Sequence, residues 1–323
     1  SDQSKQYIIV LILQSQSMTS DEIKALKDDY LKFSITELKV IEDKYGYILN
    51  GVSMLEHNGL NDTPDDACQM DTLFGHDYIY EYICKLKFRV SSQAFFQVNT
   101  ISAQNLYNTA ANWIKNIEND NIILFDICCG TGTIGMCFSK ILTNKVKRII
   151  GIDLNKDAIN DAITNAKLNN LNNCQYYAGK AEDIINIHLN KIMDNEYCVA
   201  ILDPNRPGLH VDVLRHLRNC NRIKKIVYIS CNSKSCAHDV IKLCSTPSKK
   251  NSGIPFKPIK AIAVDLFPHT QHIEMIILLE RLKDNEMDWD KLGNQARQSF
   301  DKIQRNLIIE QQNMLKLEAL QQN

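Results

Sequence analysis

Apolar residues recur in the second half of the chain as short continuous runs separated by helix-compatible stretches. Near-continuous apolar strands that alternate with helices are typical of a sheet covered on both faces. The last two runs are joined by a loop too short for a crossover helix, so we expect this final pair to be antiparallel. The pattern predicts an α/β fold with a mostly parallel sheet and an antiparallel last strand. The runs are Ile122–Ile127, Arg148–Ile152, Tyr197–Leu202, Lys225–Ile229, Ile259–Val264 and Ile273–Leu279.

The part of the chain before residue 90 is patterned differently. An apolar run at Tyr7–Leu13 predicts a strand, a helix is expected from Ser20 with Ser20 itself as N-cap, and short alternating stretches follow. We therefore predict three parts: a small α+β, substrate-facing domain at residues 1–90, a domain at 91–283 that contains the alternating strands and helices, and a helical C-terminal extension at 284–323.

Composition and charge limit the partners and the compartment. The net charge is −1 over 323 residues, so an RNA partner requires a local basic patch. The 11 cysteines are scattered, which fits a reducing compartment. The run Tyr7–Leu13 is too short to cross a bilayer. We expect a monomer in the cytoplasm or nucleus, without membrane association; a mitochondrial form and a segment before Ser1 stay open.

A glycine loop follows the first strand of the alternating region. The stretch ILFDICCGTGTIG (Ile123–Gly135) runs from an apolar strand into Gly130 and Gly132, which allow a ligand to approach the backbone. Alone, the loop fits a tight turn between strand and helix equally well. Asp153 ends the next strand, where a carboxylate can accept hydrogen bonds from both ribose hydroxyls; a helix N-cap is the structural alternative. Together they predict an adenosyl ligand, with Asp126 bracing the loop.

Four further motifs lie at strand ends or in the loops after them. They are SSQAFFQVN (Ser91–Asn99), LDPNRPGL (Leu202–Leu209), YISCNS (Tyr228–Ser233) and FPHTQHIEM (Phe267–Met275). In this order the set resembles the RNA uracil-5 methyltransferase family, over roughly residues 90–280. The resemblance implies a Rossmann-like class I methyltransferase sheet, S-adenosyl-L-methionine as cofactor and an RNA substrate. It is closest to the eukaryotic enzymes that methylate the T-loop uridine of tRNA.

The resemblance also implies roles for individual residues. Cys231 is the implied nucleophile and Glu274 the implied base. Arg206 is expected to face RNA; Phe96, beside Phe95, is expected to stack a base, with a core position as the alternative. The expected cofactor-binding residues are Gln97, Asp153 and Asp203 by resemblance, and Cys128, Gly130, Gly132 and Thr133 by their place in the glycine loop.

The chemistry of uracil explains these residue types independently. Carbon 5 is too weak a nucleophile to take a methyl group from a sulfonium, so a thiolate must first add at carbon 6. A base must then remove the proton of carbon 5 so that the thiol can leave. Because a free thiol has a pKa of about 8.5, the site must either favour the thiolate or deprotonate the thiol on attack. We expect the apolar strand around Glu274 to raise its pKa.

Two departures from the family pattern and several alternatives remain at this point. Asn205 and Ser233 stand where the family commonly has proline. A ribosomal-RNA uracil-5 methyltransferase, an RNA cytosine-5 methyltransferase and a non-catalytic tRNA-binding or tRNA-folding protein are the alternatives. The complete set of reacting residues argues against lost catalysis, and no N-terminal β-barrel domain is recognisable, which favours tRNA. Only Cys68 and Cys84 precede residue 100, so we expect no metal cluster.

Overall fold

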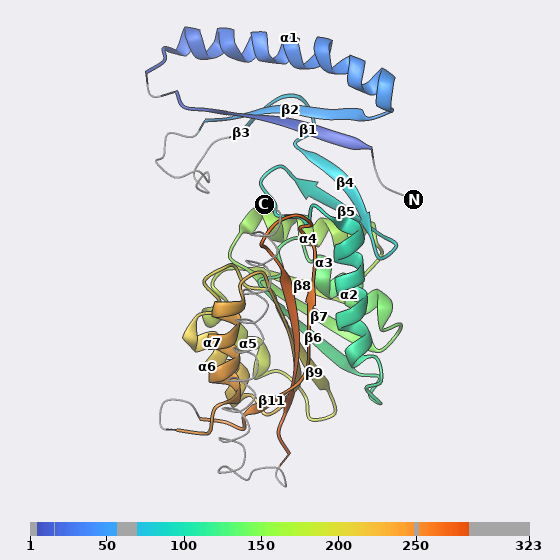
Figure 1. Cartoon of the computed structure of the whole chain (residues 1–323), viewed down its shortest axis with the longest axis vertical. Helices are drawn as coiled ribbons and strands as arrows, with labels where there is room; N and C mark the ends of the chain where they lie inside the picture. The colour runs from blue at the N-terminus through green and yellow to red at the C-terminus, as the bar shows by residue number, and fades with distance from the viewer. Residues whose placement is uncertain (1–4, 16, 57–69, 249–251, 284–323) are drawn as a thin grey trace, which may run out of the picture. The chain divides into compact units, whose positions relative to one another are not determined.

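The chain divides into two compact units, residues 1–181 and 182–323, and each is described here by itself. The computed structural model describes residues 5–15, 17–56, 70–248 and 252–283 (Figure 1). The predicted C-terminal extension at 284–323 lies outside the described residues. The domain boundaries predicted at residues 90 and 283 stay predictions.

The first unit begins with a helix over a small sheet (Figure 1). Strand β1 (Gln6–Leu13) pairs in parallel with β2 (Ile48–Glu56), and β2 pairs antiparallel with β3 (Met70–Gly75). Helix α1 (Ser20–Tyr45) connects the parallel pair. The expected N-cap at Ser20 is wrong. Thr19 is the N-cap, because its side chain accepts from the backbone of Glu22 and the Glu22 carboxylate accepts from the backbone of Thr19, a capping box.

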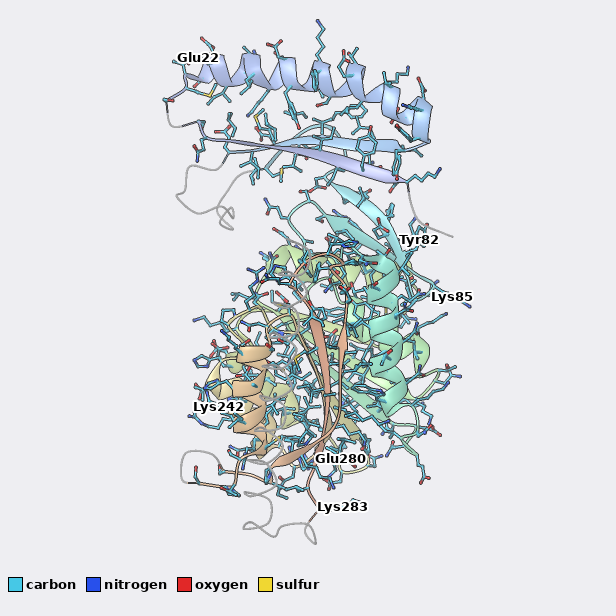
Figure 2. All side chains as sticks on the ribbon, in the orientation of Figure 1. Glu22, Tyr82, Lys85, Lys242, Glu280 and Lys283 are labelled. Carbon is cyan, nitrogen blue, oxygen red and sulfur yellow. The ribbon has the colours of Figure 1, made fainter. Side chains whose placement is uncertain are left out.

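A two-stranded hairpin follows in the same unit. Strand β4 (Tyr78–Ile83) pairs antiparallel with β5 (Leu86–Ser91). The turn consists of Cys84 and Lys85, which both have positive φ, at 52° and 62°. Figure 2 labels Lys85 at this end of the hairpin. One face of β5 is buried through Leu86, Phe88 and Val90, so the hairpin is anchored by alternate residues.

The rest of the first unit alternates helices with parallel strands. Strand β6 pairs in parallel with β7, and β7 with β8. Every residue of β6 is buried, as expected for a strand covered on both faces. The elements are α2 (Thr100–Ile114), β6 (Ile122–Ile127), α3 (Thr133–Ile141), β7 (Val146–Asp153), α4 (Lys156–Leu168) and β8 (Cys174–Ala178).

The second unit continues the alternation and ends in antiparallel strands. Strands β9 and β10 are parallel, whereas β12 runs antiparallel to both β10 and β11, as the short connecting loop predicted. Helices α6 and α7 pack against each other. The elements are α5 (Ala181–Leu189), β9 (Tyr197–Leu202), α6 (Val211–Asn219), β10 (Ile223–Ser230), α7 (Ser233–Cys244), β11 (Phe256–Val264) and β12 (Glu274–Arg281).

The strand order confirms the predicted fold class. The seven strands of the large sheet follow the order β11-β12-β10-β9-β6-β7-β8, and β12 is the antiparallel member. In the part of the chain that the structure describes, no helix has both the length and the apolar character needed to cross a membrane.

A buried arginine fixes the position of β12. The Arg281 guanidinium donates hydrogen bonds to five main-chain carbonyls within the second unit and lies over the ring of Phe256. Burial lowers the pKa of Arg281 to about 10, so the group stays charged at neutral pH. Arg281 thereby anchors one end of β12, and Glu274 stands at the other end.

Candidate active site

The glycine loop has a backbone conformation that residues with a side chain rarely adopt. Cys128, Gly130 and Gly132 all have positive φ, at 62°, 52° and 75°. The amides of Cys128 and Cys129 both donate to the carbonyl of Ile152, at 2.8 and 3.1 Å, which attaches the loop to the end of β7. Helix α3 starts directly after Gly132, so the N-terminal end of a helix adjoins the loop, as is typical of a site for a polar ligand.

Asp153 is joined to the loop rather than to a helix. Its Oδ2 accepts a hydrogen bond from the Gly130 amide at 2.8 Å, and its Oδ1 accepts from the Asn155 amide at 2.9 Å. The N-cap of α4 is Asn155, which accepts from the amides of Asp157 and Ala158. The alternative reading of Asp153 as an N-cap is therefore wrong. Its carboxylate lies at the end of β7, where the adenosyl prediction needs it.

The side-chain carboxylate of Asp126 anchors the first turn of α3. Its Oδ2 accepts from the Gly135 amide at 2.9 Å, which agrees with the bracing role predicted for it. A Cβ at Gly135 would lie 2.7 Å from the same oxygen, so this position requires glycine. Complete burial raises the pKa of Asp126 to about 7, helped by the nearby charge of Asp153.

Two observations test whether this half of the site fits an adenosyl ligand. A Cβ placed on Gly130 would meet nothing within 4 Å, so there is open space beside the loop. The Oε1 atom of Gln97 is buried and has no hydrogen-bond partner among the described residues. A buried acceptor without a donor is unfavourable unless a ligand supplies one. S-adenosylmethionine carries N–H donors on its ammonium group and adenine, so the residues present fit it.

The remaining predicted residues of the first unit differ in how far their side chains are buried. Thr133 is buried, and its Oγ1 lies 2.8 Å from the Oγ1 of Thr131. The ring of Phe96 packs against Phe88 with 6.0 Å between centroids, whereas Phe95 is 72% exposed. Of the two phenylalanines, Phe95 has the free ring face that stacking on a base would need. The RNA contact predicted for Phe96 stays a prediction.

In the second unit, strand register brings Cys231 and Glu274 together. Ser230 of β10 pairs with Met275 of β12 in antiparallel register. Cys231 directly follows the last residue of β10, and Glu274 is the first residue of β12, so the thiol and the carboxylate stand at the same end of this pair. Cys231 is exposed, unlike the other cysteines in the described part of the chain, whereas Glu274 is only 3% exposed.

The charges around Cys231 work against the thiolate. Partial burial raises the pKa of Cys231, and the negative charges of Glu274 and Asp203 raise it further, while Arg206 lowers it. Burial alone raises the pKa of Glu274 to about 7, which confirms the expected direction. Of the two possibilities for the thiol, this arrangement favours deprotonation on attack, since the resting site does not stabilise the thiolate. It also poises Glu274 to exchange a proton near neutral pH.

Two residues of the second unit that were not predicted as site residues, Asn232 and Asp239, hold its loops. The Asn232 side chain donates to the carbonyl of Arg206 at 2.9 Å. Asp239 accepts from the Leu209 amide at 2.8 Å and from the Tyr228 hydroxyl at 2.7 Å. Asn232 was visible as part of the YISCNS motif, but its contact crosses to another loop. The signal for Asp239 was an acidic residue on the apolar side of a helix, where it is 1% exposed.

Within the described ranges, no group of three or more His, Cys, Asp or Glu side chains is placed to hold a metal ion. Cys68 lies outside these ranges.

Comparison with known proteins identifies the family of the chain. A family model described as tRNA (uracil-5-)-methyltransferase matches residues 66–282. The human tRNA (uracil-5-)-methyltransferase homolog A is 41% identical over 226 residues, which cover 70% of this chain and 35% of that protein. The zebrafish (Danio rerio) homolog B is 39% identical and covers 67% of this chain and 44% of that protein. The chain thus spans well under half the length of these curated relatives.

A solved structure shares the fold. The tRNA (uracil-54, C5)-methyltransferase of Pyrococcus abyssi, determined with S-adenosyl-L-homocysteine, superposes with a TM-score of 0.56 at 24% identity. The match covers 72% of this chain and 50% of that chain. The strand order and this likeness define the class of fold, that of the class I methyltransferases. The chain belongs to the tRNA (uracil-5-)-methyltransferase family, which confirms the predicted family.

Proposed function

We propose that this chain methylates carbon 5 of a uridine in tRNA, most specifically the uridine of the T-loop, with S-adenosylmethionine as methyl donor. The observation that carries the proposal is the pairing of a solvent-exposed thiol, Cys231, with a buried carboxyl group, Glu274, at the same end of two paired strands. A tRNA substrate is supported by the names of the curated relatives and the solved neighbour. The T-loop position follows from the family resemblance.

The cofactor is proposed to bind at the glycine loop. Asp153 would accept from the ribose hydroxyls, and the buried Oε1 of Gln97 would accept from a cofactor N–H. The backbone of Cys128, Gly130 and Gly132 would lie against the ligand, since these positions keep bulky side chains away or adopt positive φ. When bound, the cofactor supplies an electrophilic methyl group on a sulfonium. Thr133 and Asp203 complete the proposed set.

Cys231 is proposed to activate the uracil ring. Its sulfur forms a bond to carbon 6 while the electrons of the carbon 5–carbon 6 double bond shift onto the carbonyl oxygen as an enolate. Because the Cys231 side chain is exposed, its proton can leave to solvent during the attack. Arg206 is the nearby positive group that favours the thiolate. Carbon 5 of the enolate would then attack the methyl group, whose bond to the sulfonium sulfur would break with its electron pair left on sulfur, so that S-adenosyl-L-homocysteine is the leaving group.

Glu274 is proposed to complete the reaction. Its carboxylate removes the proton from carbon 5, the double bond to carbon 6 forms again, and the bond from carbon 6 to sulfur breaks. A base with a pKa of about 7 is well matched to this step at neutral pH, because a useful fraction is ionised and the proton it takes is readily released. Its burial keeps competing water away from the carboxyl group.

The test is product analysis on unmodified tRNA. The chain is incubated with S-adenosylmethionine and a tRNA transcript, and the RNA is digested for nucleoside mass spectrometry. We expect 5-methyluridine from the wild type and none from Cys231→Ala. Cys220→Ser is the matched control, since this half-buried thiol of the same unit has no proposed role and its loss should leave the product unchanged.

The outcomes separate the alternatives. Formation of 5-methylcytidine would favour a cytosine-5 enzyme, and methylation of ribosomal RNA but not of tRNA would favour a ribosomal-RNA enzyme. Binding of tRNA without any methylated nucleoside would favour a tRNA-binding or tRNA-folding protein. Persistence of 5-methyluridine in Cys231→Ala would overturn the role of this thiol.

A further inference from the structure

Helix α4 and strand β5 are joined by a ladder of side-chain hydrogen bonds. Asp161 and Asn165 share one face of α4, and Asn169, four residues further on, is the C-cap of the helix. Four residues of helix advance by about 6 Å, and two residues of strand by about 6.6 Å, so the two spacings nearly match. The three side chains can therefore contact alternate residues of β5, one each, along the edge of the strand that is not paired with β4.

The ladder satisfies the open edge of β5. Asp161 Oδ2 accepts from the Ser91 amide at 2.9 Å. Asn165 accepts from the Arg89 amide at 2.6 Å and donates to the Arg89 carbonyl at 3.1 Å. In the same way, Asn169 accepts from the Lys87 amide at 2.9 Å and donates to its carbonyl at 2.7 Å. The helix thus replaces a neighbouring strand, because unpaired backbone groups at a buried edge are costly.

Asn165 has an additional contact that the other two lack. Its Nδ2 also donates to the carbonyl of Thr131 at 3.2 Å, in the glycine loop. Both hydrogens of the Asn165 amide and its oxygen are thereby engaged, and the residue is completely buried. Thr131 itself is 2% exposed and stands between Gly130 and Gly132. The loop is consequently held from two sides, at Gly130 by Asp153 and at Thr131 by Asn165.

We propose that Asn165 is a positioning residue for the cofactor: it fixes the carbonyl of Thr131, holds the glycine loop in its binding shape, and keeps the strand that leads to Gln97 in register with that loop. The inference rests on the proposed function in taking an S-adenosyl ligand as the occupant of the loop. A flexible loop would have to lose conformational freedom on binding, and a loop already held in place avoids that cost.

The test compares three rungs of the same ladder. Asn165→Ala removes the contact with the loop, Asp161→Ala removes a rung that is equally buried, and Asn169→Ala removes a rung with the same pair of strand contacts. Binding of S-adenosyl-L-homocysteine to the full chain is measured by isothermal titration calorimetry below the melting temperature of every variant. We expect at least a tenfold weaker Kd for Asn165→Ala and changes of no more than about threefold for the two controls.

A second readout separates positioning from general weakening of the fold. In steady-state kinetics, Asn165→Ala should raise KM for S-adenosylmethionine about tenfold and leave KM for tRNA unchanged, while all three variants lower Tm. If Asn165→Ala does not fold, Asn165→Ser makes the same comparison. Equal Kd values for the Asn165 and Asp161 variants would overturn the inference alone. A wild-type chain that binds no S-adenosyl-L-homocysteine would overturn both the inference and the proposed function.

Discussion

The side-chain amide of Asn232 donates a hydrogen bond to the main-chain carbonyl of Arg206 at 2.9 Å. This bond joins the loop after β10, which carries Cys231, to the loop after β9, which carries Asp203. The Oδ1 atom of the same side chain caps α7 by accepting from the Lys234 amide at 3.0 Å. One residue thus sets both the start of the helix and the spacing of two loops that the proposed chemistry uses.

Asn232→Asp separates these two functions. The carboxylate keeps the acceptor that caps α7 and loses the donor to Arg206, so we expect Tm to change by only about one or two degrees. We expect kcat to fall tenfold to a hundredfold, because small errors in the placement of reacting groups are costly. Asn232→Ala should show a similar loss of rate and a larger loss of Tm. Wild-type kcat in Asn232→Asp would show that this bond does not position the site.

The surroundings of Cys231 predict opposite effects of two substitutions on its reactivity. Glu274→Gln removes a charge that raises the pKa of Cys231, so alkylation by iodoacetamide at pH 8 should become a few times faster. Arg206→Gln removes a charge that lowers this pKa, so alkylation should become slower. Peptide mass spectrometry follows the modification, with buried Cys236 as an internal control, since burial raises its pKa to about 12. Changes in the same direction would contradict this account of the site.

Burial of Glu274 predicts a stability that depends on pH. The pKa of this carboxyl group is about 7 in the folded chain and about 4.3 in an unfolded one, so folding favours the protonated form. The resulting stabilisation is complete below about pH 4.3 and is lost as the pH rises through 7. Tm of the wild type should therefore fall relative to Glu274→Gln between pH 5 and 8. A Tm difference between the two proteins that stays constant over this range would contradict the raised pKa.

Ser233 stands where the family commonly has proline, and its position in the structure explains both residues. It is the first residue of α7, where proline is well tolerated, and Asn232 before it has the extended backbone that proline requires, with φ −131° and ψ 103°. Ser233→Pro should therefore stabilise the second unit by about 0.5 kcal/mol and keep activity. Lys234→Pro is the control, because it removes the amide that Asn232 caps and should lower Tm. A lower Tm in Ser233→Pro would contradict this placement.

The large sheet was predictable because buried parallel strands appear in the sequence as continuous apolar runs. The runs Ile122–Ile127 and Tyr197–Leu202 coincide with β6 and β9, since every position in a doubly covered strand favours an apolar residue. The hairpin turn at Cys84 and Lys85 was not predictable. Both residues have positive φ, and neither is the asparagine or glycine that normally marks such a turn.

The site was predictable where residues carry chemistry and not where they only support it. Cys231 and Glu274 belong to motifs whose residue types match the proposed reaction, and strand register brings them to one end of a strand pair. Asn165 and Asp239 act through hydrogen bonds to backbone atoms of other loops. Polar side chains of this kind look like ordinary helix residues until the fold shows which backbone groups they meet.

In the proposed reaction, Cys231 bonds to the uracil ring and Glu274 is needed for its release. The most direct measurement is the intact mass of Glu274→Gln after incubation with S-adenosylmethionine and unmodified tRNA, followed by digestion with nucleases. We expect a stable protein–nucleotide adduct at Cys231, and no adduct when Cys231→Ala is combined with Glu274→Gln. An adduct on another residue, or free turnover in Glu274→Gln at the wild-type rate, would contradict these roles.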